Sequence, residues 1–176
     1  MNREASESQA AIALDLINSA FANRAPPLVL TDSMQLSDCE YAEVMSFQGL
    51  SRQDVTFSQV ERCSDAVFWF SPEAFCYYLP GILVAGLKET RWDSNAYDSL
   101  IGCLDRSPEP DYWDDFFIPR WPLLSAEEID AVAAWVRWLA IVQPDETHGN
   151  IYERVQDTLT LLKWRAHEKE SLNCSI

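Results

Sequence analysis

The chain has 176 residues, 48% of them hydrophobic, which is enough to bury a substantial core in one domain. Its 28 acidic and 13 basic side chains give a net charge of −15, which argues against nucleic-acid binding and against an anionic membrane surface. Five scattered Cys without a C-x-x-C pair give no zinc spacing, and the first 20 residues lack the apolar core of a signal peptide, so we expect a cytoplasmic protein without metal or cofactor.

Helical spacing of apolar residues begins near the N-terminus. Residues 6–23 are predicted to form an amphipathic helix with Ile12, Leu16 and Phe21 on its apolar face, which Leu14 and Ile17 widen, and two prolines end it. Ser37-x-x-Glu40 has the spacing of a capping box and predicts a helix over 38–48. Residues 56–62 are compatible with a further short helix.

The longest apolar run, residues 65–89, predicts a buried central helix. Ser71 followed by Pro72 is a strong helix start, because the Ser oxygen accepts from free N–H groups and Pro needs no N–H at the first position. Pro80 lies in the middle and predicts a kink or two helices that meet there. The run is too interrupted to span a bilayer, which needs about 20 apolar residues.

The C-terminal half alternates between helix and loop signals. A helix is expected over 94–105, followed by a long loop over 106–122, where four prolines in fifteen residues forbid a long helix. Ser125 and Glu128 form the clearest capping box and predict a helix over 126–142, and residues 150–170 predict a last helix. We therefore expect an all-α, irregular single-domain bundle of five to six helices over 1–176, with an ordered core of 6–170 and a frayed tail of 171–176.

A resemblance accompanies the central stretch. After Cys63-Ser64-Asp65-Ala66 and an aromatic run come Pro-Glu-Ala-Phe (72–75) and Tyr-Tyr-Leu-Pro (77–80). This order resembles a bacterial family of small proteins of unknown function, which also has counterparts of Ile17 and Phe21 and of the segment 124–139. The resemblance covers roughly residues 10–140. It implies a helical fold and no catalytic residues.

Negative charge is concentrated around the proline-rich loop. Residues 89–130 hold 11 acidic and 3 basic side chains, a net charge of −8. Interfaces favour aromatic anchors in a polar rim, and carboxylates there pair with Arg or Lys of a partner. We therefore predict a partner-binding site, with Asp93 and Asp98 as further contributors, made of Asp105, Glu109, Asp111, Tyr112, Trp113, Asp114, Asp115 and Phe116. The alternative is that the aromatics fill the core while the acids face water.

Catalytic and metal chemistry find little support in the sequence. Asp111, Asp114 and Asp115 could hold a hard cation, but the calcium-loop spacing and its central Gly are missing. The chain contains no nucleophile elbow, phosphate loop or His-Glu-x-x-His motif. We therefore expect that the protein is not an enzyme.

These observations lead to one leading hypothesis. The chain is expected to be an acidic cytoplasmic binding protein that neutralises a basic protein partner, most concretely an immunity protein that inhibits a bacterial toxin by occlusion. The first alternative is an enzyme or small-ligand-binding protein with an aromatic-lined pocket. A second alternative is a nucleic-acid mimic with two spaced rows of carboxylates.

Overall fold

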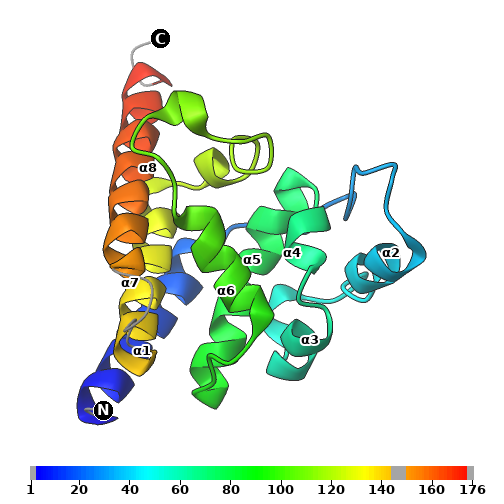
Figure 1. The fold of residues 1–176 in the computed structure, drawn as a ribbon, viewed down its shortest axis with the longest axis horizontal. Coiled ribbons are helices and arrows are strands. Elements are labelled where there is room, and N and C mark those ends of the chain that lie inside the picture. The colour runs from blue at the N-terminus through cyan, green and yellow to red at the C-terminus, as the bar shows by residue number, and fades with distance from the viewer. Residues whose placement is uncertain (1–2, 144–149, 174–176) are drawn as a thin grey trace. The chain divides into compact units, whose positions relative to one another are not determined.

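Helices joined by turns and loops make up the polypeptide (Figure 1). The structure, a computed structural model, describes residues 3–143 and 150–173, and these contain no strand, which confirms the all-α class. The described residues contain eight α-helices and three 3₁₀ turns, which are α1 (Arg3–Ala20), α2 (Asp38–Met45), η1 (Arg52–Asp54), α3 (Phe57–Arg62), α4 (Ala66–Trp69), α5 (Pro72–Glu89), α6 (Asn95–Leu104), η2 (Pro110–Tyr112), η3 (Trp121–Leu123), α7 (Ala126–Val142) and α8 (Ile151–Asn173).

Two details differ from the expected helix pattern. The helix count exceeds five or six because the apolar run before Ser71 forms the short helix α4, and α3 is helical as well. Helix α8 continues to residue 173, beyond the expected end of the ordered core at 170, and residues 174–176 lie outside the described residues. None of the described helices is long and apolar enough to cross a membrane.

The chain divides into two compact units. The terminal unit comprises residues 1–20 and 101–176, and the central unit comprises residues 21–100. The terminal unit brings together α1 and α7, which are distant in the sequence, whereas the contacts of the central unit join elements that follow one another closely. The expectation of a single domain stays a prediction.

In the terminal unit, α1 and α8 both pack against α7 (Figure 1). Helix α7 begins after the predicted capping box: the Ser125 hydroxyl accepts from the Glu128 N–H, and the Glu128 carboxylate accepts from the Ser125 N–H at 2.8 Å. Side-chain amides then hold α7 from both neighbours. Gln9 of α1 donates to the Ala134 carbonyl at 3.1 Å, and Gln156 of α8 donates to the Ala133 carbonyl at 3.0 Å.

The buried face of α1 agrees only in part with the predicted one. Ile17 is buried as predicted, together with Ala13, whereas Ile12 and Leu16 are 48% and 38% exposed. Gln9 lies one turn before Ala13 on the same side of α1, and its hydrogen bond to the Ala134 carbonyl places that side against α7. Packing on α7 therefore decides which face of α1 is buried.

In the central unit, α5 is the buried core element. Every residue from Ala74 to Leu87 is buried, so the expected burial on most sides is confirmed. The helix begins as predicted, since the Ser71 hydroxyl accepts from the Ala74 N–H at 3.2 Å. One helix runs through Pro80, so the alternative of two helices that meet there is wrong. Packing around α5 outweighs the hydrogen bond that Pro80 cannot donate.

Gly81 allows η1 to pack directly on α5. A Cβ atom at Gly81 would fall on the carbonyl oxygen of Arg52, which begins η1, and would lie 3.0 Å from a methyl group of Val55. By contrast, Gly102 in α6 has nothing within 4 Å of the corresponding position. The two helical glycines therefore differ in packing while sharing a low helix propensity.

This difference predicts opposite effects of the same substitution. Gly81→Ala should destabilise the protein by about 2 kcal/mol, because backbone atoms of η1 would have to move. Gly102→Ala should stabilise it by about 0.5–1 kcal/mol, because Ala has the higher helix propensity and meets no neighbour. Urea denaturation followed by circular dichroism measures both, and a stabilising Gly81→Ala would contradict the packing of η1 on α5.

Candidate partner-binding site

The proline-rich segment 105–122 of the terminal unit contains two short 3₁₀ turns instead of a helix. Turn η2 begins at Pro110, and η3 includes Pro122 near its start, where a missing N–H costs no internal hydrogen bond. Three aromatic residues spaced four apart anchor the segment. Trp113, Phe117 and Trp121 are 5%, 0% and 0% exposed, with centroid distances of 4.9 Å for Trp113–Phe117 and 6.0 Å for Phe117–Trp121.

Trp113 belongs to this internal anchor rather than to a surface. Its indole N–H donates to the Ser107 carbonyl at 3.0 Å, and the guanidinium of Arg165 from α8 lies 5.0 Å from its ring. Trp113 therefore fixes the segment and offers no surface to a partner. For Trp113, the structure agrees with the alternative interpretation, in which aromatics of this segment fill the core.

Asp114 is committed to the fold of the segment. One carboxylate oxygen accepts from the N–H groups of Phe116 and Phe117 at 3.1 and 2.8 Å. The other oxygen pairs with Arg106 at 3.0 Å. Asp114 therefore satisfies two backbone donors and one cation within the segment itself, which is a strong charge-assisted arrangement.

Two further members of the predicted site also have internal partners. Asp105 forms a two-pronged pair with Arg154 of α8, at 2.8 and 2.7 Å, and this guanidinium holds the pKa of Asp105 below its usual range. Phe116 is half-buried beneath Arg120, whose guanidinium lies 4.4 Å from the ring centroid and donates to the Phe116 carbonyl at 3.0 Å. Both residues therefore hold the segment in place.

The remaining members of the predicted site face solvent. Glu109, Asp111 and Asp115 are exposed, and no ion pair to them occurs within the described residues. Tyr112 is 73% exposed, and Ile118, which the sequence reasoning missed, is 50% exposed. We call these five residues the acidic edge. It combines three uncommitted carboxylates with two apolar side chains on an internally anchored segment.

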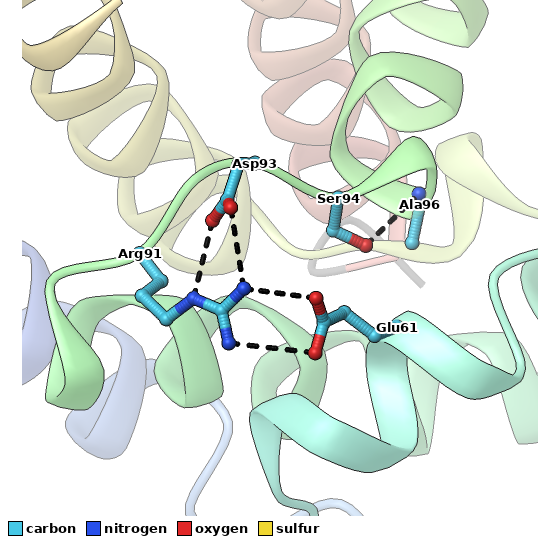
Figure 2. Close-up of polar contacts among 5 residues, drawn as sticks. All are labelled: Glu61, Arg91, Asp93, Ser94 and Ala96. Atoms are coloured by element: carbon cyan, nitrogen blue, oxygen red, sulfur yellow. Dashed lines mark hydrogen bonds and ion pairs between the residues drawn. The ribbon is translucent and has the colours of Figure 1, made fainter.

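Asp93 and Asp98 belong to the central unit. Figure 2 shows Arg91 between two carboxylates: its guanidinium bonds Glu61 of α3 at 2.8 Å and Asp93 at 3.2 Å. The same guanidinium lies 4.0 Å from the ring centroid of Phe57. Asp93 is therefore neutralised within its own unit, and the Arg91 hydrogen bond lowers its pKa. Asp98 is exposed on α6.

Most of the cysteines that the structure describes are buried. Cys63, Cys76 and Cys103 are buried thiols that form no disulfide, and burial raises the pKa of Cys103 to about 11, which keeps it protonated. Cys39 is exposed, and Cys174 lies outside the described residues. Across residues 3–143 and 150–173, no group of three or more His, Cys, Asp or Glu could hold a metal ion.

Comparison with known proteins gives a family and no activity. A family model described as a family of unknown function (DUF6714) matches residues 14–160. This span includes the whole of the acidic edge. No curated protein and no solved structure matches the chain.

The different roles of adjacent carboxylates lead to a prediction. Asp114→Ala should destabilise the protein by about 1–3 kcal/mol, because it leaves Arg106 and the Phe116 N–H without their acceptor, while the Phe117 N–H keeps only the Asp114 backbone carbonyl. Asp115→Ala removes the same charge from an exposed, unpartnered side chain and should change stability by less than about 0.5 kcal/mol. Urea denaturation followed by tryptophan fluorescence tests the pair, and equal effects would contradict the role of Asp114.

Proposed function

The chain belongs to this family of unknown function, and we propose that it is an acidic cytoplasmic binding protein that neutralises a basic protein partner. The most concrete form of the proposal is an immunity protein that inhibits a bacterial toxin by occlusion. The observation that carries it is the acidic edge, in which three carboxylates have no ion-pair partner in the part of the chain that the structure describes, while their neighbours Asp105 and Asp114 do.

Internal anchoring of the segment favours binding. A loop that must become ordered on association loses affinity for each side chain and backbone group that it immobilises. Here Trp113 and Phe117 are already buried, and Asp114 already holds the intervening backbone. The carboxylates of the acidic edge are therefore presented before a partner arrives.

The composition of the edge fits a basic surface with apolar contacts. Carboxylates form short charge-assisted hydrogen bonds with Arg and Lys, and they do so best where the surrounding surface excludes water. Tyr112 and Ile118 supply that apolar surface, and exposed tyrosines are frequent energetic anchors of interfaces. The edge would insert into a cationic active site or cover a cationic substrate groove.

The net charge supports the same class of partner. A charge of −15 attracts a cationic protein at long range and speeds its encounter, an effect that salt screens. Solubility alone would also favour an acidic chain. The specific support is therefore the position of uncommitted carboxylates beside exposed apolar side chains, rather than the total charge.

Neutralising the edge should abolish partner binding. The variant Glu109→Gln, Asp111→Asn, Asp115→Asn removes three charges and leaves the internal anchor intact. A matched control, Asp15→Asn, Asp157→Asn, Glu168→Gln, removes three exposed charges elsewhere in the terminal unit. The measurement is affinity capture from a lysate of the source organism, with salt-gradient elution and mass spectrometry.

The expected result separates the three proteins. The unaltered chain and the control should each retain one stoichiometric basic protein that leaves between low and moderate salt, because its ion pairs are screened. The edge variant should lose it. Recovery of no basic partner by the unaltered chain would contradict the proposed function. Equal capture by the edge variant would show that the partner binds outside the acidic edge.

A further inference from the structure

A groove in the central unit lies outside the surface discussed so far. It has a volume of about 540 Å³, within the range typical of ligand-binding clefts, and three parts of the unit line it. These are residues 26–31, residues 41–51 of α2 and the following turn, and the paired tyrosines Tyr77 and Tyr78 of α5. All of them belong to residues 21–100.

Large apolar side chains on the rim of this groove are exposed. Leu28 is 103% exposed, Val29 is 55% exposed and Tyr41 is 52% exposed, and all three line the groove. A fully hydrated Leu side chain forgoes the favourable free energy of burying its apolar surface. Several such side chains around one concavity are typical of a surface that a partner covers.

The chain beside the groove is fixed but has unused backbone donors. Ser71 holds it at two points: its N–H donates to the Leu30 carbonyl at 2.7 Å, and its hydroxyl donates to the Val29 carbonyl at 2.8 Å. The N–H groups of Leu28, Val29 and Leu30 donate to no group among the described residues. These donors are available to the carbonyl groups of an added extended chain.

The hydroxyl groups of the groove are largely engaged with the protein. The Tyr78 hydroxyl donates to the Phe47 carbonyl at 2.8 Å, and burial raises the pKa of Tyr78 to about 12. The Thr31 hydroxyl accepts from the Ser33 N–H, and the Ser51 hydroxyl accepts from the Gln53 N–H. These hydroxyls are used within the protein, and exposed Leu28 and Val29 lie on the rim, so the groove favours an apolar side chain.

The charge around the groove favours a bound peptide with basic residues next to its apolar side chain. Residues 25–51 contain four acidic side chains and no Lys or Arg, and the adjoining Arg52, whose guanidinium lies 5.6 Å from the Tyr77 ring centroid, donates to the Ala22 and Arg24 carbonyls. Of these, Asp32 and Asp38 are exposed and have no ion-pair partner within the described residues. Lys or Arg on either side of an apolar anchor would therefore be favoured, and acidic flanks would be repelled.

We propose that this groove binds a short extended peptide segment of a partner protein, with a large apolar side chain in the groove and Lys or Arg beside it. The peptide backbone accepts hydrogen bonds from the free N–H groups of residues 28–30. The anchor side chain lies against Tyr41, Met45 and Tyr77. This binding mode goes beyond the proposed function, because it uses no residue of the acidic edge.

Selection from a random-peptide display library on the full chain tests the proposal. The enriched peptides should share one or two large apolar residues flanked by Lys or Arg. Leu28→Ser and Tyr41→Ala should each weaken an enriched synthetic peptide at least about fivefold, the effect of losing an interface anchor. Met34→Ser is the matched control, because Met34 is 96% exposed but does not line the groove, and it should leave the affinity unchanged.

Each other outcome would overturn the proposal. No enrichment, or a consensus without the apolar anchor or the basic flanks, would remove the peptide site. Equal effects of Leu28→Ser and Met34→Ser would place binding outside the groove. Self-association that Leu28→Ser abolishes, without enriched peptides, would identify a second copy as the occupant.

A further expected result separates this site from the acidic edge. A chain with Glu109, Asp111 and Asp115 neutralised should enrich the same peptide consensus as the unaltered chain.

Discussion

The Asp114 carboxylate is the interaction on which the candidate site depends. A segment with four prolines cannot form a continuous ladder of backbone hydrogen bonds, so its order must come from side chains. The Asp114 carboxylate accepts hydrogen bonds from two backbone N–H groups and pairs with Arg106. Trp113 and Phe117 are the buried apolar side chains of the segment. Since the internal partners are already used, the carboxylates that remain are free to face a partner.

A single serine has a comparable role in the central unit. Ser71 caps α5 and at the same time holds the carbonyl groups of residues 29 and 30. The buried helix thereby fixes an irregular segment and leaves its other hydrogen-bonding groups unused. In both units, one polar side chain holds an irregular segment in place. The segment then presents groups that the fold does not use: carboxylates in the terminal unit and backbone N–H groups in the central unit.

Local signals predicted the fold well where side chain and backbone interact within one turn. The capping box of Ser125 and Glu128 marks the start of α7 because each side chain accepts a hydrogen bond from the backbone N–H of the other residue, three positions away, independent of tertiary contacts. Continuity of α5 through Pro80 depends on burial from all sides, which no local pattern contains. The buried face of α1 likewise depends on its partner α7.

The candidate site was only partly predictable for the same reason. Composition located the acidic and aromatic segment, but it does not distinguish Trp113 in the core from exposed Tyr112, or the bound Asp114 from the free Asp115. The spacing of four between Trp113, Phe117 and Trp121 was the available signal for a common buried face. Arg106, which pairs with Asp114, lies in the same segment, but Arg154, which pairs with Asp105, comes from the distant helix α8.

Order of the segment in the free protein is the central claim, and amide hydrogen exchange by NMR tests it most directly. The N–H of Phe117 is bonded to Asp114 and buried with its residue, so it should exchange far more slowly than the same amide in an unstructured peptide. Protection of this amide without any partner present is the result that our account predicts. Exchange at the rate of an unstructured chain would show that the acidic edge is not presented in advance, and would contradict it.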